Sequence, residues 1–122
     1  MNKLIPALLT ATLIAPAFAH GDLKPMHGGV IAEGKHVTVE LVAKTDSLDV
    51  YLTDHDKDID AKGTSGEVIL LSGSDKSDTK LAPAAGNQLS AKGSFKVGAG
   101  SKAIVKVSVP GKGDDQVRLS IK

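Results

Sequence analysis

The stretch HVTVELVAKTDSLDVYLT, residues 36–53, decides the fold class. Apolar and polar side chains alternate along it, which is the two-residue period of a strand with one buried face. The residues expected on the buried face are Val37, Val39, Leu41, Leu48, Val50 and Leu52. The residues expected on the face toward water are His36, Thr38, Glu40, Asp49, Tyr51 and Thr53. A turn at residues 44–47 separates the two alternating runs, so the stretch predicts a β-hairpin.

The same pattern recurs through the rest of the chain, and a helical period is nearly absent. Further strands are expected at residues 67–72, 79–81, 89–97, 103–109 and 116–121, each bounded by Gly, Pro, Asn, Asp or Ser. About seven short strands without helical crossovers predict an all-β domain, an antiparallel immunoglobulin-like β-sandwich, with an open barrel as the alternative. The predicted organisation is a cleaved segment at 1–19, a flexible segment at 20–34 and a β-sandwich domain at 35–122.

The first nineteen residues have the three parts of a secretory signal peptide. Lys3 supplies a positive charge, an apolar run extends from Leu4 to Ile14, and Ala17-Phe18-Ala19 places small residues at the two positions that signal peptidase inspects. The run is shorter than the roughly 20 residues that a permanent membrane anchor needs. We therefore expect export, cleavage after Ala19, a periplasmic location and no membrane attachment of the mature protein.

The composition of the mature chain excludes several classes of function. Removal of Lys3 leaves 14 basic residues against 14 acidic ones, so the net charge falls from +1 to about zero and does not favour nucleic-acid binding. Tyr51 and Phe95 are the only aromatic residues left, which argues against stacking of bases or sugars. Cysteine is absent, so thiol chemistry is excluded.

Cleavage after Ala19 would make His20 the first residue of the mature protein. A free α-amine and an imidazole in one residue can chelate a metal ion, and both lose their protons to it near neutral pH. A chelate of this kind suits Cu(II). The sequence therefore places a candidate ligand at the new N-terminus.

Met26 and His27 follow a few residues later, in front of Gly28-Gly29, which would let the segment fold back over a shared ion. A thioether favours Cu(I) and Ag(I), whereas imidazole and amine also suit Cu(II), Ni(II) and Zn(II). The mixed set favours copper, with silver or zinc as alternatives, and zinc is the less well matched. The plainer interpretation is a hydrophobic Met26 and a solvated His27 in a turn.

The run from Asp54 to Asp60 is very acidic and contains His55. Its Asp-x-Asp-x-Asp start is similar to a calcium loop, but Ile59 occupies the glycine position and Ser65 the position of the bidentate glutamate, so an EF-hand site is rejected. A solvated turn is one interpretation. The other is that His55 adds a fourth ligand to the N-terminal site, whereas His36 is expected to be a surface residue.

Lys24-Pro25-Met26-His27-Gly28-Gly29 resembles the Pro-Met-His signature in metal-binding segments of heavy-metal efflux adaptor proteins. With His20-Gly21 and residues 51–55, it looks like small periplasmic proteins of proteobacteria associated with copper and other heavy-metal resistance. A weaker resemblance links the mature N-terminal histidine and the small β-sandwich to CopC-type copper carriers, in which that histidine is a Cu(II) ligand. Only His20 carries over from that family, because no histidine follows His55 to complete its site.

Together these features predict a non-enzymatic protein that sequesters or transfers copper through His20, Met26 and His27, with His55 as an addition. The resemblance implies a component of a metal-efflux system as partner. The alternative is an adaptor domain that binds a protein partner and no metal. Neither a Ser-His pairing nor a Gly-x-Ser-x-Gly motif is present to indicate a hydrolase.

The chelate at His20 can be tested by adding one residue before it. The extension removes the free amine of His20, so the affinity for Cu(II) should fall at least about tenfold. A competition titration of the two proteins measures this. Equal affinities would contradict the chelate.

Overall fold

The computed structural model describes residues 23–122, so the expected signal peptide and His20 lie outside the described residues. Nine strands make up the described chain: β1 Val30–Glu33, β2 Thr38–Ala43, β3 Ser47–Asp54, β4 Lys57–Asp58, β5 Ser65–Ser72, β6 Asp75–Pro83, β7 Gln88–Lys92, β8 Lys102–Val109 and β9 Gly113–Ser120. Every pairing between them is antiparallel. The predicted all-β class is confirmed. Across residues 23–122 we find no helix long and apolar enough to cross a membrane.

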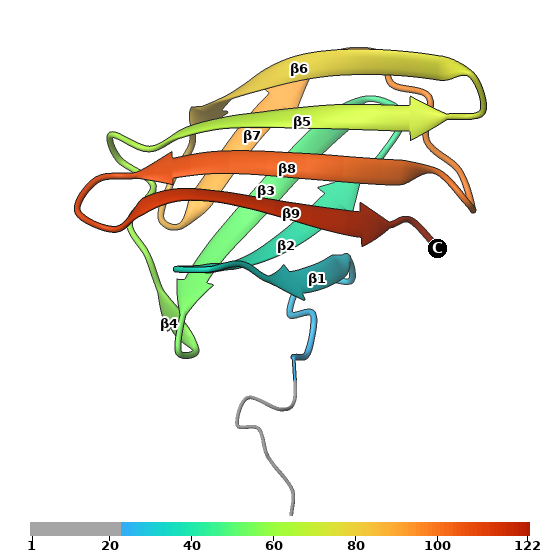
Figure 1. Cartoon of the computed structure of the whole chain (residues 1–122). Coiled ribbons are helices and arrows are strands. Elements are labelled where there is room, and N and C mark those ends of the chain that lie inside the picture. Colours follow the sequence, from blue (N-terminus) through green and yellow to red (C-terminus); the bar gives the residue numbers. More distant parts are fainter. Residues whose placement is uncertain (1–22) are drawn as a thin grey trace, which may run out of the picture.

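The strands form one hydrogen-bonded path in the order β1-β2-β3-β7-β6-β5-β8-β9, with β4 paired to β3. Strand β6 joins two layers, because residues 75–81 pair with β5 whereas Ala82 and Pro83 pair with β7. One layer holds β1, β2, β3 and β7, and the other holds β5, β8, β9 and most of β6 (Figure 1). The two ends of the path, β1 and β9, lie next to each other. The architecture is therefore a two-layered antiparallel sheet that nearly closes into a barrel, with features of both predicted alternatives. The immunoglobulin-like order of strands stays a prediction.

The predicted alternation places the core as expected. Val39 and Leu41 of β2 pair with Leu52 and Val50 of β3, and all four are at most 1% exposed. The opposite layer supplies Val68, Leu70, Val105, Val107, Val117 and Leu119 to the same core. Burial of these side chains stabilises the fold by roughly 1.5–3 kcal/mol each, which a chain without disulfides requires.

Two strands were not predicted from the sequence. Strand β1 lies within residues 20–34, the segment expected to be flexible. Val30, Ile31 and Ala32 pair with β2, and Val30 and Ala32 pack against the core. The regular structure of the described chain therefore begins five residues before residue 35. Strand β4 is the short return of a hairpin that follows β3.

Asp115 closes the seam between β9 and the β1–β2 turn. Its buried carboxylate accepts hydrogen bonds from the backbone N–H groups of His36 and Val37 at 2.7 and 2.9 Å, and its other oxygen lies 2.6 Å from His36 Nδ1. A Cβ at Gly34 would lie 2.4 Å from the same carboxylate, so the turn needs glycine there. Burial raises the pKa of Asp115, but the N–H groups and the His36 ring outweigh it and hold the pKa below its usual value.

Asp115→Ala should lower the free energy of unfolding by about 3 kcal/mol, because the N–H groups of His36 and Val37 lose their buried acceptor. Asp114→Ala, which removes a neighbouring exposed carboxylate, should cost no more than about 1 kcal/mol. Since the folded pKa of Asp115 lies below the unfolded value of about 3.9, its contribution is present above that pH and is lost as the pH falls through the folded pKa. Urea unfolding at pH 7 and pH 3 measures both effects. Equal costs for the two variants at pH 7 would contradict the assignment.

Candidate metal site

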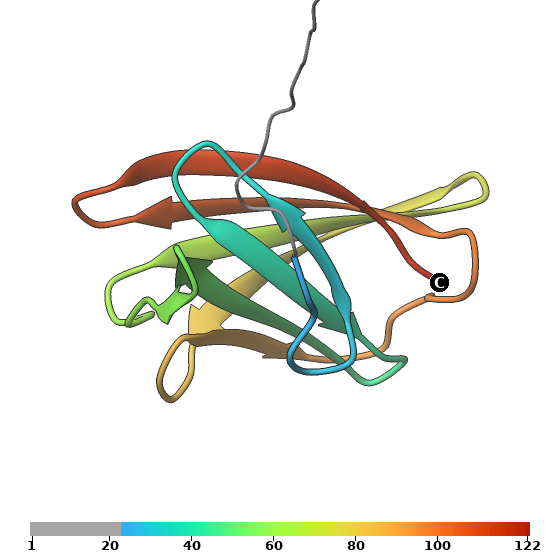
Figure 2. The ribbon, with the colours of Figure 1, turned by 90° about the horizontal axis from the view of Figure 1, so that it is seen from below.

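Residues 23–29, which we call the N-terminal strap, precede β1 and lie against the outer face of β2 and β3. The strap leads directly into β1 (Figure 2). Gly28 has a φ of +77°, and a Cβ at Gly29 would lie 2.2 Å from the carbonyl oxygen of Leu41, so the glycine pair lets the backbone turn and approach β2 closely. The pair predicted to let this segment fold back thus sits at a fixed turn.

Glu40 on β2 holds the strap in place. Its Oε1 accepts a hydrogen bond from Met26 N–H at 3.0 Å, and its Oε2 accepts bonds from the N–H groups of His27 and Gly29 at 2.8 and 3.0 Å. The ring atom His27 Nδ1 lies 2.9 Å from Oε1. The prediction that Glu40 faces water is wrong, because the strap covers it and leaves it 4% exposed.

The environment of Glu40 keeps its carboxylate charged. Burial raises the pKa of Glu40. The hydrogen bonds from the His27 ring and from the three backbone N–H groups lower it by a larger amount, so the pKa lies below its usual value. The outer face of the hairpin thus carries a buried, fully bonded negative charge directly beneath Met26 and His27.

The imidazole of His27 is stacked on the ring of Tyr51, which is paired with Glu40 across the hairpin. The two ring centroids are 3.6 Å apart and the planes differ by 5°. Burial, together with the charges of Asp49 and Glu40, raises the pKa of Tyr51. The stack and the hydrogen bond to Glu40 fix the His27 ring in place while its side chain stays 41% exposed.

Met26 is directed to solvent beside this ring and is 79% exposed. Met26 and His27 line a hollow of about 610 Å³ together with Tyr51, Asp56 and Asp58. A thioether and an imidazole at the rim of one hollow are donors that suit a soft or borderline metal ion. The structure therefore brings together two of the four predicted ligands.

His55 lies beside this hollow rather than in it. It is the first residue of a two-residue turn between β3 and β4, and both His55 and Asp56 have positive φ values, 52° and 67°, as in a type I′ turn. Its side chain is 88% exposed, and its Nδ1 lies 2.7 Å from Asp54, whose other oxygen accepts a bond from Lys112 at 2.6 Å. The acidic run, for which a solvated turn was one of the two interpretations, thus begins with a short, exposed hairpin turn.

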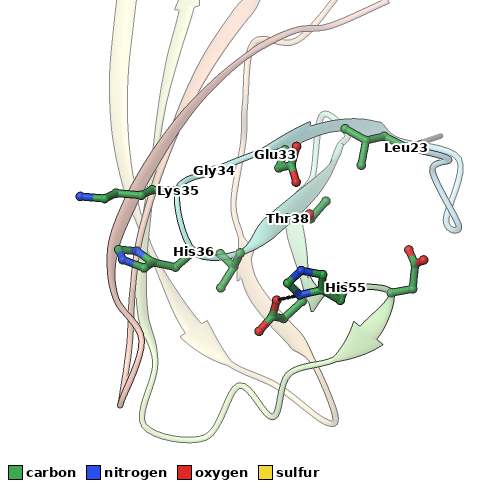
Figure 3. Close-up of a pocket in the computed structure, with 10 residues that line it drawn as sticks. Leu23, Glu33, Gly34, Lys35, His36, Thr38 and His55 are labelled. Carbon is green, nitrogen blue, oxygen red and sulfur yellow. Dashed lines mark hydrogen bonds and ion pairs between the residues drawn. The ribbon is translucent and has the colours of Figure 1, made fainter. Parts of the chain in front are cut away.

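The hollow that His55 lines also includes His36 (Figure 3). The two rings do not converge, because the ring of His36 is directed away from His55 and lies against Asp115 and Gly113. This hollow shares Leu23, Thr38 and Asp56 with the Met26–His27 hollow, so the two hollows adjoin. His55 is therefore near the Met26–His27 pair without contacting it.

His20, which precedes Leu23 by three residues in the sequence, lies outside the described residues. Leu23 lines both hollows. Within residues 23–122, no group of three or more His, Cys, Asp or Glu side chains is placed to hold a metal ion.

Glu40 and Tyr51 are the site residues that sequence reasoning missed. Both stand on the polar face of the hairpin, where alternation predicts exposure to water. Two features of the sequence could have indicated them. The hairpin register pairs Glu40 with Tyr51. A double-glycine turn at residues 28–29 also leaves backbone N–H groups that need a nearby acceptor, which Glu40 supplies.

The stack and the Glu40 bond predict unequal effects for the same substitution at two histidines. His27→Ala should lower the free energy of unfolding by about 1–2 kcal/mol and increase quenching of Tyr51 fluorescence by acrylamide, because the ring that covers Tyr51 is lost. His55→Ala, at an 88% exposed side chain, should change stability by no more than about 0.5 kcal/mol. Tyr51 is the only tyrosine and the chain has no tryptophan, so its emission is unambiguous. Unchanged Tyr51 quenching in His27→Ala would show that the stack does not form.

The sequence matches no family model and no curated protein, and no solved structure matches the chain.

Proposed function

We propose that the exported protein binds copper, or the related ion silver, in the periplasm and sequesters it or passes it to a partner. The observation that carries this proposal is the exposed Met26 thioether beside the exposed His27 imidazole, on a strap whose backbone is tied to the sheet. A single exposed methionine is ordinary at a protein surface. Here the thioether stands beside an imidazole at the rim of one hollow, and metal ligation would give this pair of donors a role.

The proposed ligands are His20, Met26 and His27. Sulfur from Met26 and nitrogen from His27 form a set that suits Cu(I) and Ag(I), and the amine and imidazole of His20 extend it toward Cu(II). Zn(II) is less well matched to this set, because it binds a thioether less readily than Cu(I) or Ag(I) does. His55 is a further candidate, since its hollow adjoins that of Met26 and His27 through Leu23 and Asp56.

A carrier agrees better with this geometry than an enzyme. Met26 and His27 stand at the surface of one short strap, where a partner could take the ion by exchanging one ligand at a time. The resemblance to small proteins of heavy-metal resistance and to CopC-type carriers points in the same direction, and it suggests a component of a metal-efflux system as the partner. The competing proposal is an adaptor domain that contacts a protein partner without metal.

The test is a competition titration of protein that begins at His20, against Cu(I), Ag(I), Cu(II) and Zn(II). One-to-one binding of copper or silver tighter than micromolar is expected. Met26→Leu, which keeps the volume but removes the sulfur, should weaken Cu(I) and Ag(I) at least about tenfold and Cu(II) less.

His27→Ala should weaken all of these ions. His36→Ala is the matched control and should leave the affinities unchanged, because that ring is directed to Asp115 and away from the strap. The same titration of His55→Ala shows whether His55 contributes. Failure of every ion to bind more tightly than micromolar would refute the carrier and favour the adaptor.

A further inference from the structure

The carboxylate of Glu40 makes more contacts than a simple anchor for the strap needs. Each of its oxygens is an acceptor for two donors: Oε1 for Met26 N–H and His27 Nδ1, and Oε2 for the N–H groups of His27 and Gly29. A carboxylate whose two oxygens both accept backbone N–H bonds is an acceptor only. The fourth contact, to the imidazole, therefore has a defined direction.

The direction of that contact fixes the tautomer of His27. Nδ1 lies 2.9 Å from an acceptor, so Nδ1 carries the proton, and in the neutral ring Nε2 then holds the lone pair. Among residues 23–122 no hydrogen bond to His27 Nε2 is formed. The parallel stack on Tyr51 limits rotation of the ring out of its plane.

We propose that Glu40 is the positioning residue of the metal site, which presents Nε2 of His27 as the coordinating atom and couples ion binding to docking of the strap. This inference rests on the proposed function. A carboxylate that accepts a bond from one imidazole nitrogen while the other binds the ion is a recurrent arrangement at metal sites, where it orients the ring and raises its basicity.

The coupling follows from the sharing of one carboxylate. Three of its four bonds hold the strap backbone, and the fourth orients the ligand, so a change in one alters the others. An ion on Nε2 withdraws electron density from the ring and makes Nδ1–H a stronger donor to Glu40. Ion binding should therefore strengthen docking, and docking should strengthen ion binding by the same factor.

The tautomer can be tested in the wild-type protein without metal. A long-range ¹H–¹⁵N spectrum of the mature protein, recorded at a pH at which the imidazole of His27 is neutral, should show a protonated Nδ1 and an unprotonated Nε2. The opposite tautomer would overturn the inference. Because no metal is added, this result is independent of whether the protein binds an ion.

Addition of Ag(I), which is diamagnetic, supplies the second test. The ¹⁵N signal of Nε2 should move while Nδ1 keeps its proton, and the amide protons of His27 and Gly29 should exchange with solvent more slowly. Loss of the Nδ1 proton, or unchanged exchange despite bound Ag(I), would contradict the assignment. Absence of any Ag(I) binding would instead refute the proposed function.

Two charge-neutralising variants separate positioning from general electrostatics. Glu40→Gln should weaken Ag(I) binding at least about tenfold and abolish the fixed tautomer of His27. Asp49→Asn removes a charge from the same face of β3, where Asp49 bonds Gln88 and Ser90, and should leave both properties unchanged. Equal losses in the two variants would show that charge alone matters.

Discussion

The structure depends on one constraint, that a buried carboxylate must be surrounded by donors. Burial of an unpaired charge would cost far more than the few kcal/mol that stabilise a domain of this size. Glu40 and Asp115 satisfy the constraint in the same way, each with backbone N–H groups and one imidazole. Asp115 thereby closes the seam of the fold, and Glu40 fixes the strap.

The two carboxylates divide structure from proposed function. His36 has a structural role at the seam between β9 and the β1–β2 turn, since its ring contacts Asp115 and packs against Gly113. His27 has the same kind of partner, but it stands next to an exposed methionine and follows His20 by seven residues in the sequence. Neighbouring residues, more than the histidine–carboxylate pair itself, therefore distinguish the candidate ligand from the structural residue.

The sequence predicts the local part of this fold well and the non-local part poorly. Alternation along residues 36–53 identifies the hairpin and its buried face, because the two-residue period is a property of each strand alone. Burial of Glu40 and pairing of β1 with β2 depend on an N-terminal segment that folds back over the hairpin. The two-residue alternation within a strand carries no information about that contact. Likewise, Met26 and His27 could be singled out by their chemistry, whereas the separation of His55 from them depends on the β3–β4 turn. The register of the hairpin, which follows from the sequence, places Glu40 opposite Tyr51 and so positions both contacts of His27.

X-ray absorption of the Cu(I)-loaded protein that begins at His20 shows whether Met26 and His27 bind one ion together, because sulfur and imidazole ligands scatter distinguishably. One sulfur together with at least one imidazole around copper is predicted, with the sulfur lost in Met26→Leu and the imidazole contribution reduced in His27→Ala. A copper environment of nitrogen and oxygen alone, the same in wild type and Met26→Leu, would contradict the account.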